Sequence, residues 1–128
     1  MGNPGHNHLK LQVKSRWVAA LRSGMFQQAS NTLRNSEGHC CLGVLCELHA
    51  EETGTQFVVP DDGSTAEQSY LGSSEYLPPA VADWAGLTDI DPSVSWSNEE
   101  GIHYSSLSDC NDRDVPFEKI ADIIEEQL

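Results

Sequence analysis

Basic residues are scarce in this chain of 128 residues. It has 7 Lys and Arg against 20 Asp and Glu, a formal net charge of −13 with neutral histidines. Such an acidic chain repels phosphate backbones, so we expect no direct binding to nucleic acid.

Long apolar runs are also missing. No stretch approaches the roughly 20 apolar residues that span a bilayer. The first ten residues lack the apolar segment of a secretory signal. We therefore expect a cytoplasmic protein without a membrane partner.

The local signatures of common cofactor and catalytic sites are absent. The chain has no GxGxxG, Walker loop, HExxH or GxSxG motif. Cys40 and Cys41 are adjacent and Cys46 follows, which is too crowded for the usual zinc spacing. We expect reduced, buried thiols, no metal and no cofactor.

The charges that are present divide unevenly along the chain. Residues 1–36 hold five basic residues and no acid, whereas residues 37–128 hold two basic residues and all 20 acids. The first third offers cations either to an anionic ligand or to the acidic remainder of the chain. We expect the acidic remainder to have one of three roles: to keep the chain soluble, to imitate nucleic acid or to bind a basic partner protein.

Apolar periodicity predicts two longer helices in the first half. Leu9, Val13, Trp17 and Leu21 are four apart, and Gly24 is a suitable residue to end that helix. A second helix over 39–52 is apolar around most of its girth and should be central. Within it, Gly43 is expected to permit a close crossing by another element.

The second half predicts shorter elements. A short helix should follow Pro79 and end at Gly86, and residues 93–97 and 102–106 should form a hairpin with a four-residue loop. Residues 107–114 are predicted as a polar loop, and Pro116 should open a final helix.

Together these patterns predict one compact α+β domain over residues 9–128. It should contain a central apolar helix, N- and C-terminal amphipathic helices and a small antiparallel sheet. Residues 1–8 should form a flexible lead-in, and residues 61–74 a mobile acidic loop with Tyr70 as a candidate anchor.

One group of residues suits a nucleotide-like anion. Arginine forks bind phosphate, indole offers a stacking face and amides add hydrogen bonds. The alternative is that the tryptophan is a core residue and the arginines pair with the acidic remainder. The candidate ligand-binding residues are Trp17, Arg22, Gln27, Gln28, Arg34, Asn111 and Asp112.

A second arrangement offers cysteine chemistry. Cys40 or Cys41 stands at an expected helix N-terminus, which lowers a thiol pKa. His103 and Asp112 follow in the Cys, His, Asp order of papain-like enzymes. The alternative is core cysteines with a surface histidine.

Several segments resemble an uncharacterised family of small phage, prophage and bacterial proteins. These segments are residues 20–24, 40–46 (CCLGVLC), 76–78, 84–87, 111–112 and 120–124. The resemblance implies an accessory gene product that acts in the cytoplasm of a host cell. It brings no activity or catalytic residue.

Three functions follow as hypotheses, and the oligomeric state stays open. The first is a non-enzymatic binder that counters a host process such as antiviral defence, by capturing a nucleotide-derived signal or by blocking a host protein. The second is a DNA mimic that inhibits a nucleic-acid-binding host protein. The third is a Cys-dependent hydrolase or transferase.

Overall fold

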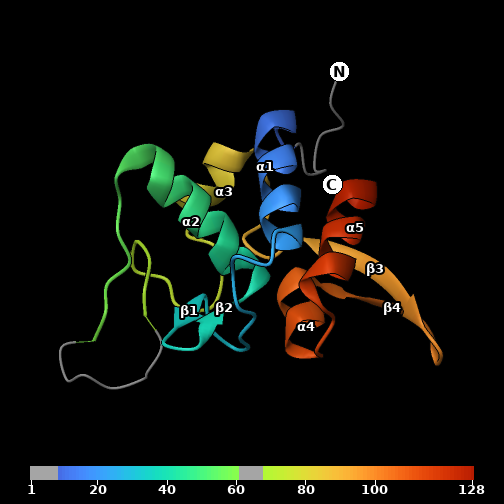
Figure 1. The fold of residues 1–128 in the computed structure, drawn as a ribbon. Helices are drawn as coiled ribbons and strands as arrows, with labels where there is room; N and C mark the ends of the chain where they lie inside the picture. The colour runs from blue at the N-terminus through green and yellow to red at the C-terminus, as the bar shows by residue number, and fades with distance from the viewer. Residues whose placement is uncertain (1–8, 61–67) are drawn as a thin grey trace.

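The N-terminal apolar stripe forms helix α1 (Leu11–Arg22) in the computed structural model, which describes residues 9–60 and 68–128 (Figure 1). Its predicted stripe, from Leu9 to Leu21, is buried. Gly24 adopts φ +76°, a left-handed conformation open to glycine, so the chain turns away where the sequence predicts.

Helix α2 (Cys41–Thr53) is central, as its composition predicts. Cys40 caps it, because its sulfur accepts a hydrogen bond from the Gly43 N–H at 3.4 Å. A Cβ built on Gly43 would lie 1.7 Å from the carbonyl oxygen of Leu33. The predicted close crossing is thus confirmed, and the element that crosses is the segment before β1 (Arg34–Asn35).

Three further helices cover the second half. Helices α3 (Pro79–Ala85) and α5 (Phe117–Gln127) lie where the sequence predicts them. The predicted polar loop over 107–114 is wrong, because its first part is helix α4 (Leu107–Asp112). Ser106 caps α4 by accepting from the Asp109 N–H, and Leu107 and Cys110 are buried in the core.

Two antiparallel pairs of strands complete the described residues. The small pair is β1 with β2 (Gly38–His39), around the predicted turn. The larger is the hairpin of β3 (Ser93–Asn98) and β4 (Gly101–Ser106), with Ser93 opposite Ser106 and Asn98 opposite Gly101. Its loop is two residues, Glu99 and Glu100, rather than the four predicted. Figure 1 shows the hairpin extending away from the helices.

The stretch predicted as a mobile acidic loop falls partly within the described residues. Residues 61–67 lie outside them, as do residues 1–8 of the predicted lead-in. After that gap, Tyr70 is fully buried and Ser69 pairs with Val58. Tyr70 therefore anchors the end of this stretch in the core.

One hydrophobic cluster draws on all five described helices and on β3. The predicted α+β class is confirmed: this is one small domain with two sheets of two strands each. Over residues 9–60 and 68–128, no helix is both long and apolar enough to cross a membrane.

Candidate functional site

Trp17, predicted to stack on a ligand, lies in the core. The side chain is fully buried on α1, and its indole N–H donates to the Cys41 carbonyl oxygen at 3.0 Å. It therefore ties α1 to the start of α2, and neither ring face is open to a ligand.

Arg22 joins α1 to α5 on the surface. Its guanidinium lies 2.6 Å from a carboxylate oxygen of Asp122 and 3.1 Å from one of Glu125. Hydrogen bonds to Glu125 and Asp122 raise the pKa of Arg22, and Arg22 in turn lowers the pKa of Glu125. Both carboxylates stabilise the charged arginine without a ligand.

Arg34 is partnered in a different place. Its guanidinium is 3.2 Å from Glu47 and lies over the Phe57 ring, 4.8 Å from the ring centre. The ring of His39, 3.8 Å from Glu47, and the charge of Arg34 hold the pKa of Glu47 below its usual range. The two arginines line separate hollows, so they do not converge on one anion.

The structure brings Gln28, Asn111 and Asp112 together. The Asn111 carboxamide accepts from the Cys41 N–H and from the Gln28 side chain, and donates to the Ala29 carbonyl at 2.7 Å. Asp112 accepts from the Asn31 N–H at 2.9 Å. These contacts hold the loop after α1 against α2 and α4.

Gln27, unlike Gln28, makes no side-chain hydrogen bond to Asn111. Its side chain is exposed, and its backbone carbonyl accepts from the His39 N–H at 2.9 Å. The predicted ligand residues are therefore divided between the core, two surface ion pairs and a loop junction.

A small hollow adjoins that junction. Its volume is about 60 Å³, and its lining includes the carboxylates of Glu75 and Asp112 but no Lys or Arg. The remaining lining residues are Asn31, Thr32, Cys40, Tyr76 and Ser108. The size and the charge of this hollow are poorly matched to a nucleotide-like anion.

The four cysteines are free and buried. Burial raises the pKa of the Cys40 thiol to about 11 and raises the pKa of Cys41, Cys46 and Cys110 as well. At neutral pH such thiols stay protonated, and the thiolate is the nucleophile.

His103, the base of the predicted cysteine arrangement, has other partners. Its ring stacks on Trp96 at 4.4 Å between centres, and its Nε2 lies 3.0 Å from the Asn98 side-chain oxygen. Within the described residues no thiol is hydrogen-bonded to an imidazole. In the same residues, no three His, Cys, Asp or Glu side chains gather as metal ligands.

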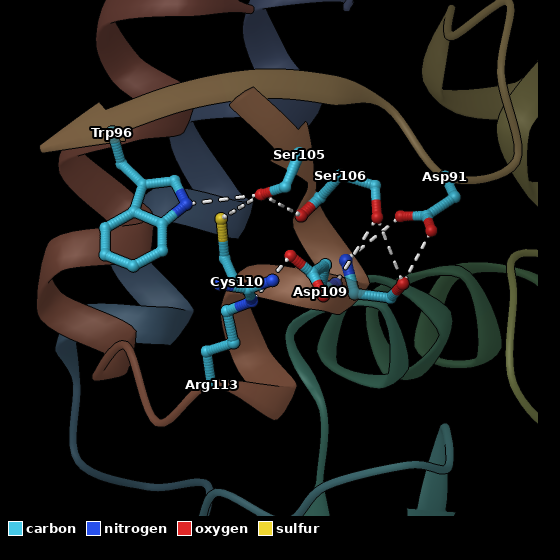
Figure 2. A network of polar contacts seen from close by, with 8 residues as sticks. Asp91, Trp96, Ser105, Ser106, Asp109, Cys110 and Arg113 are labelled. Carbon is cyan, nitrogen blue, oxygen red and sulfur yellow. Dashed lines mark hydrogen bonds and ion pairs between the residues drawn. The ribbon is translucent and has the colours of Figure 1, made fainter. Parts of the chain in front are cut away.

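A polar network fixes the base of the hairpin to α4 (Figure 2). Asp91 accepts from the backbone N–H and the hydroxyl of Ser108, at 3.0 and 2.5 Å. The Ser105 hydroxyl accepts from the Trp96 indole N–H at 3.2 Å and contacts the Cys110 sulfur. The hairpin is therefore held rigidly at its base while its tip projects.

Among the large apolar side chains of residues 68–128, the projecting hairpin carries the two most exposed. Ile102 is 66% exposed and Tyr104 is 82% exposed. Alternation places both on one face with Ser93, Ser95, Ser97 and Ser106, and we call this set the hairpin face. The opposite face holds the buried Val94.

Carboxylates of the tip and of α5, together with Lys119, lie near the hairpin face. Glu99 and Glu100 form its tip, and both are exposed. The adjoining helix α5 exposes four more, at positions Glu118, Asp122, Glu125 and Glu126. In the sequence, Ile102 and Tyr104 indicate only a strand. Their isolation between serines and acids was the available sign that this face stays in solvent.

A family model described as "Domain of unknown function (DUF8296)" matches residues 9–128. No curated protein and no solved structure matches the chain.

Proposed function

The chain belongs to this DUF8296 family, and from its own surface we propose that it is a non-enzymatic protein that binds and blocks a basic partner protein. The partner is a nucleic-acid-binding protein of a host cell. The binding surface is the hairpin face with the acidic tip and α5. The phage or prophage origin that fits this role rests on the sequence resemblance.

The hairpin face carries the proposal. Protein interfaces place aromatic and aliphatic side chains at the centre of a polar rim. Tyr104 and Ile102 supply such a centre at 82% and 66% exposure, and the exposed Glu99 and Glu100 supply an acidic rim. A rigid base, held by the Asp91–Ser108 contacts, lowers the entropy lost on binding.

Charge specifies the partner. Two exposed carboxylates at the tip, together with Glu126 of α5, attract a basic surface and speed its encounter. Such a surface is the one that nucleic-acid-binding proteins present to phosphates. By binding that basic surface, this chain would exclude nucleic acid from it. One mechanism would therefore serve both the blocking hypothesis and the DNA-mimic hypothesis.

The partnered arginines make nucleotide capture the weaker proposal. An anion at Arg22 would have to displace Asp122 and Glu125, and one at Arg34 would have to displace Glu47. The raised thiol pKa values give the cysteine-enzyme hypothesis no comparable support.

A capture experiment with matched variants tests the proposal. The immobilised chain is exposed to a nuclease-treated bacterial lysate at low salt, and retained proteins are quantified by mass spectrometry. We expect basic proteins to be retained, and Glu99→Gln/Glu100→Gln to lower their recovery by about tenfold. Glu37→Gln/Glu51→Gln removes the same charge from exposed sites on β1–β2 and α2 and should leave recovery unchanged.

Two results would overturn the proposal. One is equal loss of recovery in the hairpin variant and in the matched control. The other is a thermal shift with nucleotides that disappears in Arg22→Gln/Arg34→Gln, which would favour the capture of a nucleotide-derived signal.

A further inference from the structure

We propose that the outer edge of β4 binds an extended basic segment of the partner as an added strand. The contact would run through the outward-facing backbone N–H and C=O groups of Ile102 and Tyr104. This inference rests on the proposed function and specifies how the partner is held.

The alternation of hydrogen-bonded and non-hydrogen-bonded pairs along the hairpin shows which backbone N–H and C=O groups of β4 face outward. Pairs of an antiparallel ladder alternate between those that exchange backbone hydrogen bonds and those that do not. The Gln127 side chain bonds both the N–H and the C=O of Ser95, at 2.8 and 2.6 Å, so these groups point away from β4. The pair of Ser95 with Tyr104 is therefore one that does not exchange bonds.

A second hydrogen bond confirms which pairs of the hairpin are hydrogen-bonded. The Leu107 N–H donates to the Pro92 carbonyl at 3.0 Å, one pair beyond Ser93 and Ser106. Bonded pairs therefore fall at even positions of β3. Ile102, opposite Ser97, thus also turns its N–H and C=O away from β3.

The outer edge of β3 is already covered by α5. The Gln127 side chain is hydrogen-bonded to the backbone of Ser95, and the Lys119 ammonium donates to the Ser97 carbonyl at 3.1 Å. These two side chains close that edge to another strand in the way natural sheets protect their edges.

The outer edge of β4 is open. The sheet ends at β4, and within residues 9–60 and 68–128 no backbone partner lies against Ile102 or Tyr104. A strand added there would accept two main-chain hydrogen bonds from the N–H groups of these residues and donate two to their carbonyl oxygens. Its side chains on one face would meet Tyr104 and Ile102 as cross-strand neighbours.

Charge favours a basic segment over a second copy of this chain. An added strand that follows β4 to its end reaches the exposed carboxylates of Glu99 and Glu100. A second copy would bring the same carboxylates and a net charge of −13, whereas alternating Lys or Arg residues would complement them.

Peptide binding to proline and serine variants tests the inference. The probes are fluorescent eight-residue peptides that alternate Lys or Arg with Val or Thr, each with a Glu counterpart, measured by anisotropy. Tyr104→Ser removes the side chain only, whereas Tyr104→Pro also removes the outward N–H without touching the ladder. Leu11→Pro against Leu11→Ser makes the same two changes at a 76% exposed apolar residue in the first turn of α1, away from the hairpin, and is the control.

We expect basic peptides to bind more tightly than their Glu counterparts. Tyr104→Pro should weaken that binding at least about tenfold beyond Tyr104→Ser, and both Leu11 variants should leave it unchanged. Amide NMR shifts of residues 93–106 report whether the hairpin is intact, and Ile102→Pro against Ile102→Ser repeats the comparison if Tyr104→Pro disturbs it. Equal affinities in the Pro and Ser variants, or equal binding of the basic and Glu panels, would overturn the inference.

Two further outcomes separate this inference from the proposed function. If capture from lysate depends on Glu99 and Glu100 but is equal in Tyr104→Pro and Tyr104→Ser, the function stands and strand addition is wrong. A dimer in sedimentation equilibrium that Tyr104→Pro dissociates would assign the edge to a second copy and overturn the peptide mode.

Discussion

The Asn111 carboxamide joins three segments at the residue scale. It is 1% exposed and bonds the Cys41 N–H, the Gln28 side chain and the Ala29 carbonyl. Asn111→Ala leaves these buried groups unsatisfied and should lower the free energy of unfolding by about 2–4 kcal/mol in urea titrations. Asp112→Asn keeps an oxygen for the Asn31 N–H and is the control. A loss below about 0.5 kcal/mol for Asn111→Ala would contradict this structural role.

His49 makes stability depend on pH. It is 8% exposed, and its Nδ1 lies 2.6 Å from the Tyr70 hydroxyl. Burial lowers the pKa of His49, and this effect is larger than that of the Glu52 charge, which raises it. The unfolded chain therefore binds a proton as the pH falls through about 6.5, before the folded chain does. Stability contributed by neutral His49 is present above that pH and is lost below it.

The measurement is urea unfolding of wild type and His49→Gln at pH 7.5 and pH 5.5. The free energy of unfolding should fall more steeply towards pH 5.5 in the wild type than in His49→Gln. Parallel pH dependences in the two proteins would show that His49 is protonated equally in the folded and unfolded states.

At the scale of elements, the crossing of α2 over the segment before β1 sets the tightest packing. An added Cβ at Gly43 would meet the Leu33 carbonyl oxygen at 1.7 Å, and backbone on both sides must move. Gly43→Ala should lower the free energy of unfolding by about 3 kcal/mol or more. Gly54→Ala faces open space at φ +79° and should cost about 1–2 kcal/mol. Equal effects of the two substitutions would contradict the tight crossing.

Elements with a strong local pattern could be predicted from the sequence. Helices α1, α2, α3 and α5 and the hairpin have clear periodicity with glycine or proline at their ends. Helix α4 was missed because only Leu107 and Cys110 mark its apolar face, among serines and acids. Its stability comes from packing against α2 and α5, which no local pattern records.

The candidate binding residues could not be placed from the sequence for a related reason. Trp17 belongs to the apolar stripe of α1, and its side chain is buried in the core. Arg22 meets Asp122 and Glu125 about a hundred positions away, so only the fold shows that its charge is already balanced. Ile102 and Tyr104 alternate as half-buried strand residues do, and only tertiary structure shows their exposed face.

At the scale of the whole molecule, internal ion pairs balance part of the charge asymmetry. Arg16, Arg22 and Arg34 of the basic first third each contact carboxylates on α2 or α5. Glu99 and Glu100, at the hairpin tip, have no ion pair within the described residues. Two of the carboxylates left for a partner therefore lie at the projecting end of the molecule.

Hydrogen exchange of the whole chain, free and in complex with the basic protein that it captures, tests this account most directly. The account predicts that protection on binding concentrates in residues 99–106, with the Ile102 and Tyr104 amides slowed at least about tenfold. Protection centred on Arg22 or Arg34, with unchanged exchange in the hairpin, would contradict it.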